Sequence, residues 1–138
     1  MKFSNIVFEE IDKVARIIFN RLDVRNALNL ELLGEMIEAV EYLSKNEKIR
    51  ALIITGTGDV FSGGADVEYL ENDLCKQSAT EIYKVLSEYY GKAALSLRKL
   101  PFPVIAAING PAVGAAFDLS LNCDFRVAAR SATMGSIW

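Results

Sequence analysis

Asp118 is the side chain of this sequence best placed to move a proton. It is the only acidic residue between Glu88 and Asp124, and the surrounding segment 109–123 consists largely of small or apolar residues. A carboxylate in such surroundings must be paired, hydrogen-bonded or functional, because burying an unpaired charge is costly. The segment also includes a predicted helix start, where unpaired N–H groups carry partial positive charge. We therefore predict an anion or oxyanion site beside Asp118.

A strand, a tight turn and a helix are expected to position Asp118. The run 104–108 is apolar throughout and typical of a buried strand, and the dipeptide 109–110 is Asn-Gly, a turn sequence. Small residues from about Val113 onward favour a closely packed helix. The carboxylate is then expected close to the helix N-terminus.

The remaining elements follow from hydrophobic periodicity and capping signals. The predicted set is a hairpin of strands over 5–10 and 14–19, a helix after Asn29, a strand over 49–55, a short helix after Asp66, a long helix over 79–100 and a strand over 125–128. Asn29 can cap its helix, and Ser78 and Glu81 have capping-box spacing. Strands alternating with helices indicate an α/β fold whose pairing is mostly parallel after the first hairpin.

Two apolar stripes at helical spacing mark the faces that these helices are expected to bury. In the helix after Asn29 the stripe consists of Leu32, Leu33, Met36, Ile37, Val40 and Leu43. In the helix predicted over 79–100 it consists of Ile82, Val85, Leu86, Tyr89, Ala93, Leu97 and Leu100.

Length, composition and charge bound the classes of protein to consider. At 138 residues the chain is one domain or part of one, and 51% hydrophobic residues with a mean hydropathy of +0.21 indicate a well-packed soluble protein. A net charge of −3 and an isoelectric point near 5.0 argue against nucleic acid as a partner. We identify no signal peptide and no apolar run of membrane-spanning length, so no membrane association is expected.

Histidine and cysteine usage narrows the available chemistry. The sequence contains no histidine, which excludes a Ser-His-Asp triad, a Cys-His pair and a histidine metal site within it. Cys75 and Cys123 lack metal-ligand spacing and are expected to be free thiols in a reducing cytoplasm. We predict no metal site, so carboxylates, tyrosines, lysines and backbone dipoles remain to do the chemistry.

The glycine-rich segment 56–66 follows a predicted strand and leads into a short helix. It has neither a G-x-G-x-x-G nor a Gly-Lys-Ser/Thr pattern, so a Rossmann or P-loop nucleotide site is not expected. The adjacent residues Gly63 and Gly64 allow a ligand to approach the backbone closely. Asp66 is more typical of a helix N-cap than of a catalytic acid.

Three separate stretches, in family order, resemble the crotonase superfamily, also called the enoyl-CoA hydratase/isomerase family. They are Val14 to Arg21 together with Val24 to Asn29, then Phe61-Ser62-Gly63-Gly64-Ala65-Asp66, and then Ile105 to Asp124. The resemblance implies an α/β spiral of ββα units, the ClpP/crotonase fold. Residues 1–138 would form the N-terminal portion of one such acyl-CoA-binding domain, with the family's C-terminal helical part outside this chain.

The resemblance also implies a chemistry and a set of site residues. Family members bind acyl-CoA thioesters and stabilise an enolate at the thioester carbonyl with two backbone N–H groups, which match Ala65 and Ala115, while Asp118 becomes the candidate acid/base. The residues assigned to binding the coenzyme A thioester are Arg25, Asn26, Ala27, Gly63, Gly64 and Asp66. Coenzyme A is expected only as part of the substrate, with no permanently bound cofactor. The family's trimers and dimers of trimers imply a homo-oligomer.

Departures from the family pattern leave the reaction open. Hydratases of the family have a glutamate where this chain has Asp118, and a second glutamate where Trp138 falls. Dienoyl-CoA isomerases of the superfamily have an aspartate at the first position. One carboxylate favours double-bond isomerisation over water addition, which needs two. Decarboxylation or hydrolysis of an acyl-CoA and a non-catalytic acyl-CoA-binding subunit remain alternatives.

Overall fold

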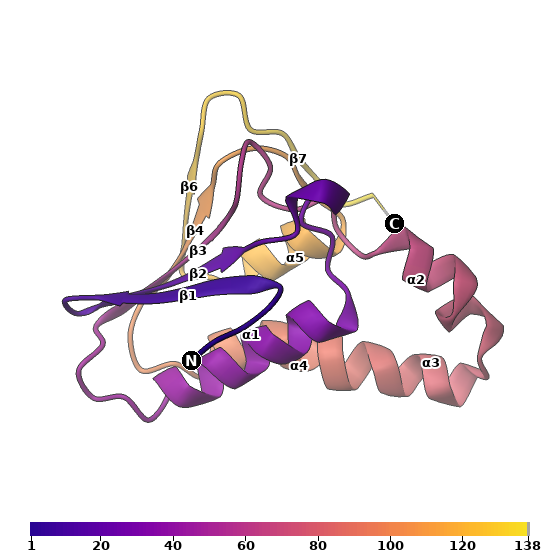
Figure 1. Cartoon of the computed structure of the whole chain (residues 1–138), viewed down its shortest axis with the longest axis horizontal. Helices are drawn as coiled ribbons and strands as arrows, with labels where there is room; N and C mark the ends of the chain where they lie inside the picture. Colours follow the sequence, from indigo (N-terminus) through magenta and orange to yellow (C-terminus); the bar gives the residue numbers. More distant parts are fainter. Residues whose placement is uncertain (138) are drawn as a thin grey trace.

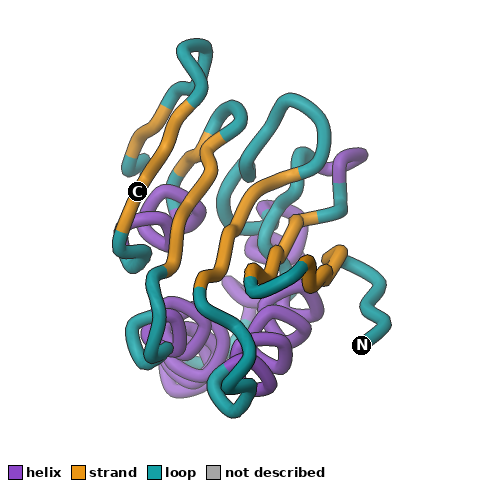
Figure 2. Tube along the Cα trace, turned by 90° about the vertical axis from the view of Figure 1, so that its left-hand side faces the viewer, coloured by secondary structure: helices purple, strands orange, loops and turns teal. Residues whose placement is uncertain are grey.

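A five-stranded sheet forms the frame of the protein. The structure, a computed structural model, describes residues 1–137. The strands are β1 (Ile6–Ile11), β2 (Val14–Phe19), β3 (Ala51–Gly56), β4 (Val104–Ile108) and β6 (Phe125–Ala128), in the spatial order β1-β2-β3-β4-β6. β1 and β2 form an antiparallel hairpin, and the other neighbours pair in parallel, which confirms both predictions. Figure 2 shows the strands running side by side, with most helical segments gathered at their lower ends.

A second group of short β pairings lies outside the main sheet. β5 (Ala112–Val113) pairs in parallel with β7 (Met134–Gly135). Single β-bridges join Ser62 to Ala112 and Leu28 to Ala65. Segments from distant parts of the sequence are thereby held next to one another.

Helices α1 (Leu30–Leu43) and α4 (Lys92–Leu97) lie side by side below the sheet (Figure 1). Asn29 caps α1 as predicted, because its Oδ1 accepts a hydrogen bond from Leu32 N at 3.0 Å. All six residues of the stripe predicted for this helix are buried. They form much of the core, together with the inward faces of β2, β3 and β4.

The other helical segments are α2 (Val67–Asn72), α3 (Ala79–Val85) and α5 (Ala115–Leu121), the 3-10 turns η1 (Leu22–Val24) and η2 (Leu74–Lys76), and the π-helical segment η3 (Leu86–Gly91). In Figure 1, α2 and α3 extend to the right, away from the sheet, whereas α5 lies close to it. Across residues 1–137, no helix has both the length and the apolar character that crossing a membrane requires.

Several predicted boundaries are wrong, and the strand predicted over 5–10 runs over Ile6–Ile11. The helix predicted from about Val113 begins at Ala115, because Val113 belongs to β5 and donates a hydrogen bond to Ser62 O at 3.2 Å. The strand predicted over 49–55 runs over Ala51–Gly56, because the Ile49 N–H instead closes a turn onto the carbonyl of Asn46 at 3.3 Å.

The long helix predicted over 79–100 is a helical path in three parts, α3, η3 and α4, that ends at Leu97. Its start is as predicted, since Ser78 Oγ accepts from Glu81 N at 3.3 Å and the Glu81 carboxylate accepts from Ser78 N at 3.0 Å. Of the predicted stripe only Ala93 and Leu97 are buried, and Leu86 is 45% exposed. Tyr89 and Leu100 are partly buried and also pack against the core, whereas the stripe residues of α3 do not, because α3 projects beyond the sheet.

Candidate active site

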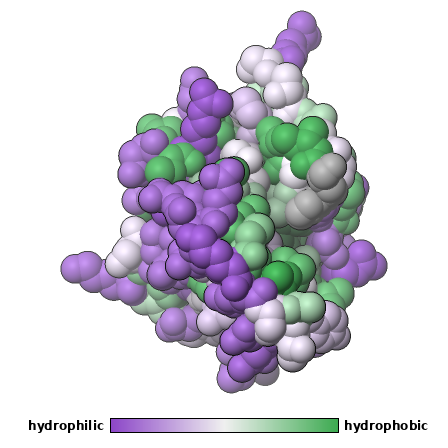
Figure 3. Space-filling model, turned by 90° about the vertical axis from the view of Figure 1, so that its right-hand side faces the viewer, coloured by the Kyte–Doolittle hydropathy of each residue, from purple (hydrophilic) through white to green (hydrophobic). Residues whose placement is uncertain are grey.

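One cavity of about 140 Å³ brings together the three residues predicted to be catalytic, Ala65, Ala115 and Asp118. The other residues that line it are mostly apolar: Leu28, Leu33, Leu70, Leu86, Tyr90, Ala94 and Leu119. Figure 3, which faces the end of the molecule where α2 and α3 project, shows patches of hydrophobic residues beside a band of hydrophilic ones. The cavity is therefore lined by one acidic residue, by Ala65 and Ala115, and by a mostly apolar wall.

The loop that contains Ala65 is held between two other segments. On one side, Leu28 N donates to Gly64 O at 2.8 Å and Asp66 N donates to Leu28 O at 3.1 Å. On the other side, Ser62 N donates to Pro111 O at 3.1 Å, and Ser62 O accepts from β5. The loop is therefore fixed along both edges by backbone hydrogen bonds.

This bonding sets the direction of the Ala65 N–H. That N–H shares a peptide unit with the Gly64 carbonyl, which points at Leu28. The peptide is trans, so its N–H points away from its C=O. The Ala65 N–H is consequently directed away from Leu28, toward the side on which Ser62 meets β5.

Gly64 brings this loop against the start of α5. Its φ is +96°, and a Cβ built on it would lie 2.6 Å from Val113 O and 3.7 Å from Ala115 N. Only glycine fits such a close approach with a left-handed backbone. What approaches Gly64 in the structure is the chain's own segment, and the approach of a ligand at Gly63 and Gly64 stays a prediction.

Ala115 is the first residue of α5, and Asp118 lies in the first turn of the same helix. Gly114 N donates to Gly135 O at 2.8 Å, and Asp118 N donates to Gly114 O at 3.1 Å. The first N–H groups of a helix have no acceptor within it and carry partial positive charge. The backbone of α5 thus presents donors at the end of the helix that carries the carboxylate.

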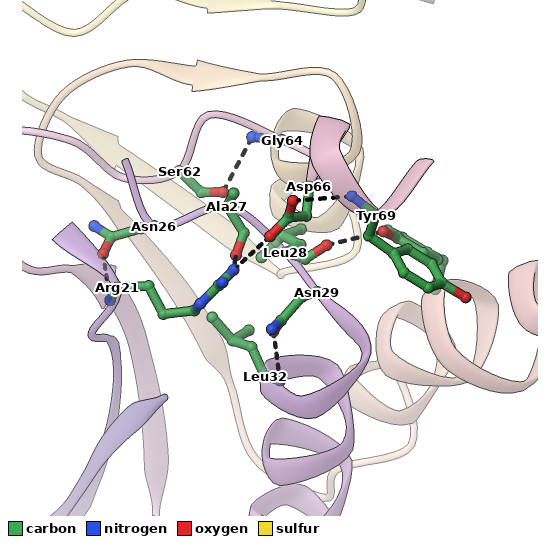
Figure 4. Close-up of polar contacts among 11 residues, drawn as sticks. Arg21, Asn26, Ala27, Leu28, Asn29, Leu32, Ser62, Gly64, Asp66 and Tyr69 are labelled. Carbon is green, nitrogen blue, oxygen red and sulfur yellow. Dashed lines mark hydrogen bonds and ion pairs between the residues drawn. The ribbon is translucent and has the colours of Figure 1, made fainter. Parts of the chain in front are cut away.

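Asp66 is the N-cap of α2, as predicted, and its carboxylate also binds Arg21. Its Oδ1 accepts from Tyr69 N at 3.3 Å, and its Oδ2 lies 2.9 Å from Arg21 Nη1 (Figure 4). Arg21 Nη1 also donates to Ala27 O at 2.8 Å. The sequence did not indicate this role for Arg21, because a separation of 45 positions from Asp66 leaves no local pattern to detect.

The predicted coenzyme A turn, residues 25–27, lies next to the glycine loop. Arg25 is exposed, and its carbonyl accepts from Gly63 N at 2.9 Å. Asn26 is fully buried, and its amide is engaged by other parts of the fold. Its partners, all at 2.9–3.2 Å, are the N–H of Arg21, the hydroxyl and carbonyl of Thr57 and the carbonyl of Val60. Its side chain therefore shapes the turn, while Arg25 remains accessible from solvent.

Asn109 holds the glycine-rich loop from the other side. Its Nδ2 donates to the carbonyls of Gly56 and Gly58, each at 3.0 Å, and its Oδ1 accepts from Gly56 N at 3.2 Å. A Cβ on the neighbouring Gly110 would come within 1.8 Å of Asp59 O. The predicted Asn109-Gly110 turn therefore serves also to anchor a loop more than 50 residues away in sequence.

Tyr90 is a polar residue that lines the cavity and that the sequence did not indicate. Its hydroxyl donates to Leu28 O at 2.8 Å. Burial raises the pKa of Tyr90 to about 12, with smaller contributions from Asp66 and Tyr69. The apolar stripe pointed instead to Tyr89, which lines a different hollow beside α1.

Cys75 and Cys123 are free, as predicted, and only Cys123 is buried. Burial raises the pKa of the Cys123 thiol to about 12.

Over residues 1–137 no group of histidine, cysteine and acidic side chains is arranged to hold a metal ion. Trp138, which matches the family's second glutamate position, lies outside the described residues.

Comparison with known proteins shows which family has this fold. A sequence model described as Enoyl-CoA hydratase/isomerase matches residues 9–137. The chain belongs to this family. A crystal structure of an enoyl-CoA hydratase/isomerase from Xanthobacter autotrophicus Py2 aligns with a TM-score of 0.90 and 30% identity, covering 97% of this chain and 49% of that one. The predicted crotonase superfamily membership and fold are confirmed.

Two curated relatives show the range of activities within this similarity. The chain is 38% identical over 136 residues to a crotonyl-CoA hydratase of Syntrophomonas wolfei, covering 98% of this chain and 50% of the relative. It is 36% identical over 137 residues to a 4-chlorobenzoyl coenzyme A dehalogenase of Arthrobacter, covering 97% and 48%. The chain thus spans about half the length of the curated relatives it matches.

Proposed function

We propose that this chain carries the catalytic centre of an acyl-CoA enzyme of the hydratase/isomerase type. The observation that carries the proposal is the cavity shared by Ala65, Ala115 and Asp118. In this mechanism the N–H groups of Ala65 and Ala115 hold the thioester oxygen while Asp118 moves a proton on the acyl chain. The apolar wall accommodates that chain.

Two fixed amide donors suit the charge that forms in such a reaction. Removing a proton next to a thioester carbonyl places negative charge on its oxygen. Donors that are already oriented stabilise this charge without reorganising, and losing one typically costs about 3–4 kcal/mol. The hydrogen bonds that fix the Ala65 loop, and the close approach of Val113 to Gly64, support this part of the proposal.

The carboxylate content favours isomerisation over hydration. Asp118 is the one acidic residue among the described residues that line the cavity. A single base can take a proton from one carbon of the acyl chain and return it to another, which moves a double bond. Adding water calls for a second group to activate the water. We therefore propose double-bond migration in an enoyl-CoA as the reaction.

On the basis of family membership, we also propose how the substrate binds and how the protein assembles. Coenzyme A enters as part of the substrate, with the exposed Arg25 guanidinium facing its phosphates. A homo-oligomer in the cytoplasm completes this proposal, and the relatives' acyl-CoA names support the substrate class.

Replacement of the carboxylate tests the proposal. Asp118→Asn should lower kcat for enoyl-CoA isomerisation by about 100-fold or more, because a general acid/base typically contributes that much. Binding of the CoA ester, measured by calorimetry, should remain close to wild type. Glu68→Gln, a matched change on the exposed face of α2, is the control and should leave kcat unchanged. Unchanged turnover in Asp118→Asn would remove Asp118 from the mechanism.

Product analysis separates the candidate reactions. The purified protein is incubated with 3-enoyl, crotonyl, malonyl-type and 4-chlorobenzoyl CoA esters, and products are identified by mass spectrometry. Migration of the double bond supports the proposal. Hydration, release of CO₂ or chloride, or free CoA would each replace it with another reaction, and binding without turnover would indicate a non-catalytic subunit.

A further inference from the structure

We propose that Tyr90 is a positioning residue for the Ala65 N–H, acting through the carbonyl of Leu28. This inference rests on the proposed function, since it gives Tyr90 a task only if Ala65 holds the thioester oxygen. Tyr90 would then determine how strongly the site polarises its substrate. It need not touch the reacting atoms to do so.

A short series of hydrogen bonds connects the two residues. The Tyr90 hydroxyl donates to Leu28 O at 2.8 Å. The same carbonyl accepts from Asp66 N at 3.1 Å, and Leu28 N donates to Gly64 O at 2.8 Å. Leu28 therefore holds the peptide units on both sides of Ala65, and Tyr90 holds Leu28.

The hydroxyl joins the Leu28 carbonyl to η3, a segment distant in sequence. Leu28 and Ala65 belong to neighbouring extended segments that would move together if both shifted. Tyr90 comes from η3, 62 residues from Leu28 in sequence. Without this hydroxyl, the backbone bonds between Leu28 and the loop remain, and Leu28 still precedes the Asn29 cap of α1, but the Leu28 carbonyl loses its hydrogen bond to η3. A misplacement of about 1 Å at a reacting centre can cost about 100-fold in rate.

The surroundings of Tyr90 keep its hydroxyl in the donor form. The ring lines the cavity, and burial together with Asp66 and Tyr69 raises the pKa of the phenol to about 12. The proton therefore stays on the oxygen at neutral pH. Short π-helical segments such as η3 occur frequently at functional sites.

The hydroxyl can be removed without removing the cavity wall. Leu86, Tyr90 and Ala94 all line the cavity and are spaced four residues apart on one face of the helical path. Tyr90→Phe keeps the ring in this wall and deletes only the hydroxyl. Tyr89→Phe makes the same chemical change at the adjacent position, whose side chain lines the hollow beside α1.

The decisive measurement is the carbonyl stretching frequency of a bound enoyl-CoA, by infrared difference spectroscopy, together with steady-state kinetics. In the wild type, hydrogen bonds to the thioester oxygen should lower this frequency. In Tyr90→Phe we expect a smaller shift and a kcat lower by about 10-fold, with KM changed by less than about 2-fold. Tyr89→Phe should match the wild type in all three, and thermal melting checks that both variants are folded.

The outcomes separate the two proposals. A wild-type frequency shift with turnover, combined with an identical shift and kcat in Tyr90→Phe, would overturn the role of Tyr90 and leave the proposed function standing. Neither shift nor turnover in the wild type would overturn both. Equal losses in Tyr90→Phe and Tyr89→Phe would indicate a general packing effect and would also overturn the specific role of Tyr90.

Discussion

Single residues of this protein combine structural and site roles, and Gly64 is the clearest case. Its left-handed backbone and its contact with Val113 bring the Ala65 peptide against the start of α5. The sequence pattern Gly63-Gly64 indicated close approach by a ligand at this point. It could not indicate that the approaching group is another part of the same chain, because no local pattern links residues 64 and 113.

Gly64→Ala should therefore destabilise the protein and disrupt the site. A Cβ within 2.6 Å of Val113 O and a φ of +96° would both have to be relieved by moving the loop. We expect a loss of roughly 1–3 kcal/mol in the free energy of unfolding and at least a 10-fold loss of turnover. Urea denaturation and kinetics measure the two effects.

Gly34→Ala is the matched control for that substitution. Gly34 lies within α1, and a Cβ there would meet nothing within 4 Å. Alanine should raise stability by about 0.5–1 kcal/mol, because it restricts the unfolded chain and favours the helix. A similar loss at both glycines would contradict the special role assigned to Gly64.

At the scale of elements, capping signals and strand patterns were predictable, whereas the surroundings of a helix were not. The Asn29 cap, the Ser78–Glu81 capping box and the parallel strands all follow from local residues. The stripe over 79–100 showed which face is apolar but not what covers it. Tyr90 was missed for this reason, since its role comes from Leu28, far away in sequence.

The Asn29 cap offers a test at this scale. Asn29→Ala removes the acceptor of the Leu32 N–H at the start of α1 and should cost about 1 kcal/mol in the free energy of unfolding. Asn29→Asp keeps a side-chain acceptor and should retain most of the stability. Equal losses in both variants, measured by urea denaturation, would show that the cap contributes little.

For the molecule as a whole, the sequence predicted the α/β class, the free thiols and the meeting of Ala65, Ala115 and Asp118. The last of these depended on the family resemblance, because Ala65 lies in the glycine-rich loop and Ala115 begins α5, far away in sequence. The ion pair between Arg21 and Asp66 was beyond prediction, since it appears only once the loops are folded together. Polar contacts between residues far apart in sequence could therefore not be predicted from the sequence alone.

The two thiols report on the integrity of the whole fold. Cys75 is exposed, whereas Cys123 is buried and its pKa is raised to about 12, which makes its reactive thiolate scarce at pH 8. Maleimide should modify Cys75 in the folded protein and Cys123 only after addition of urea, as read by mass spectrometry. Rapid modification of both under native conditions would contradict the buried position of Cys123.

The parallel order of the sheet has a kinetic consequence. β3 pairs with β2 and β4, and Leu52 lies opposite both Ala15 and Val104, so the central contacts form only after long intervening segments have been folded back. Closing such loops costs entropy before any contact is gained, and domains dominated by non-local pairing fold slowly. Refolding should take on the order of milliseconds to seconds rather than microseconds. The cavity is itself built from residues far apart in sequence, from Leu28 to Leu119, so it too depends on such long-range contacts.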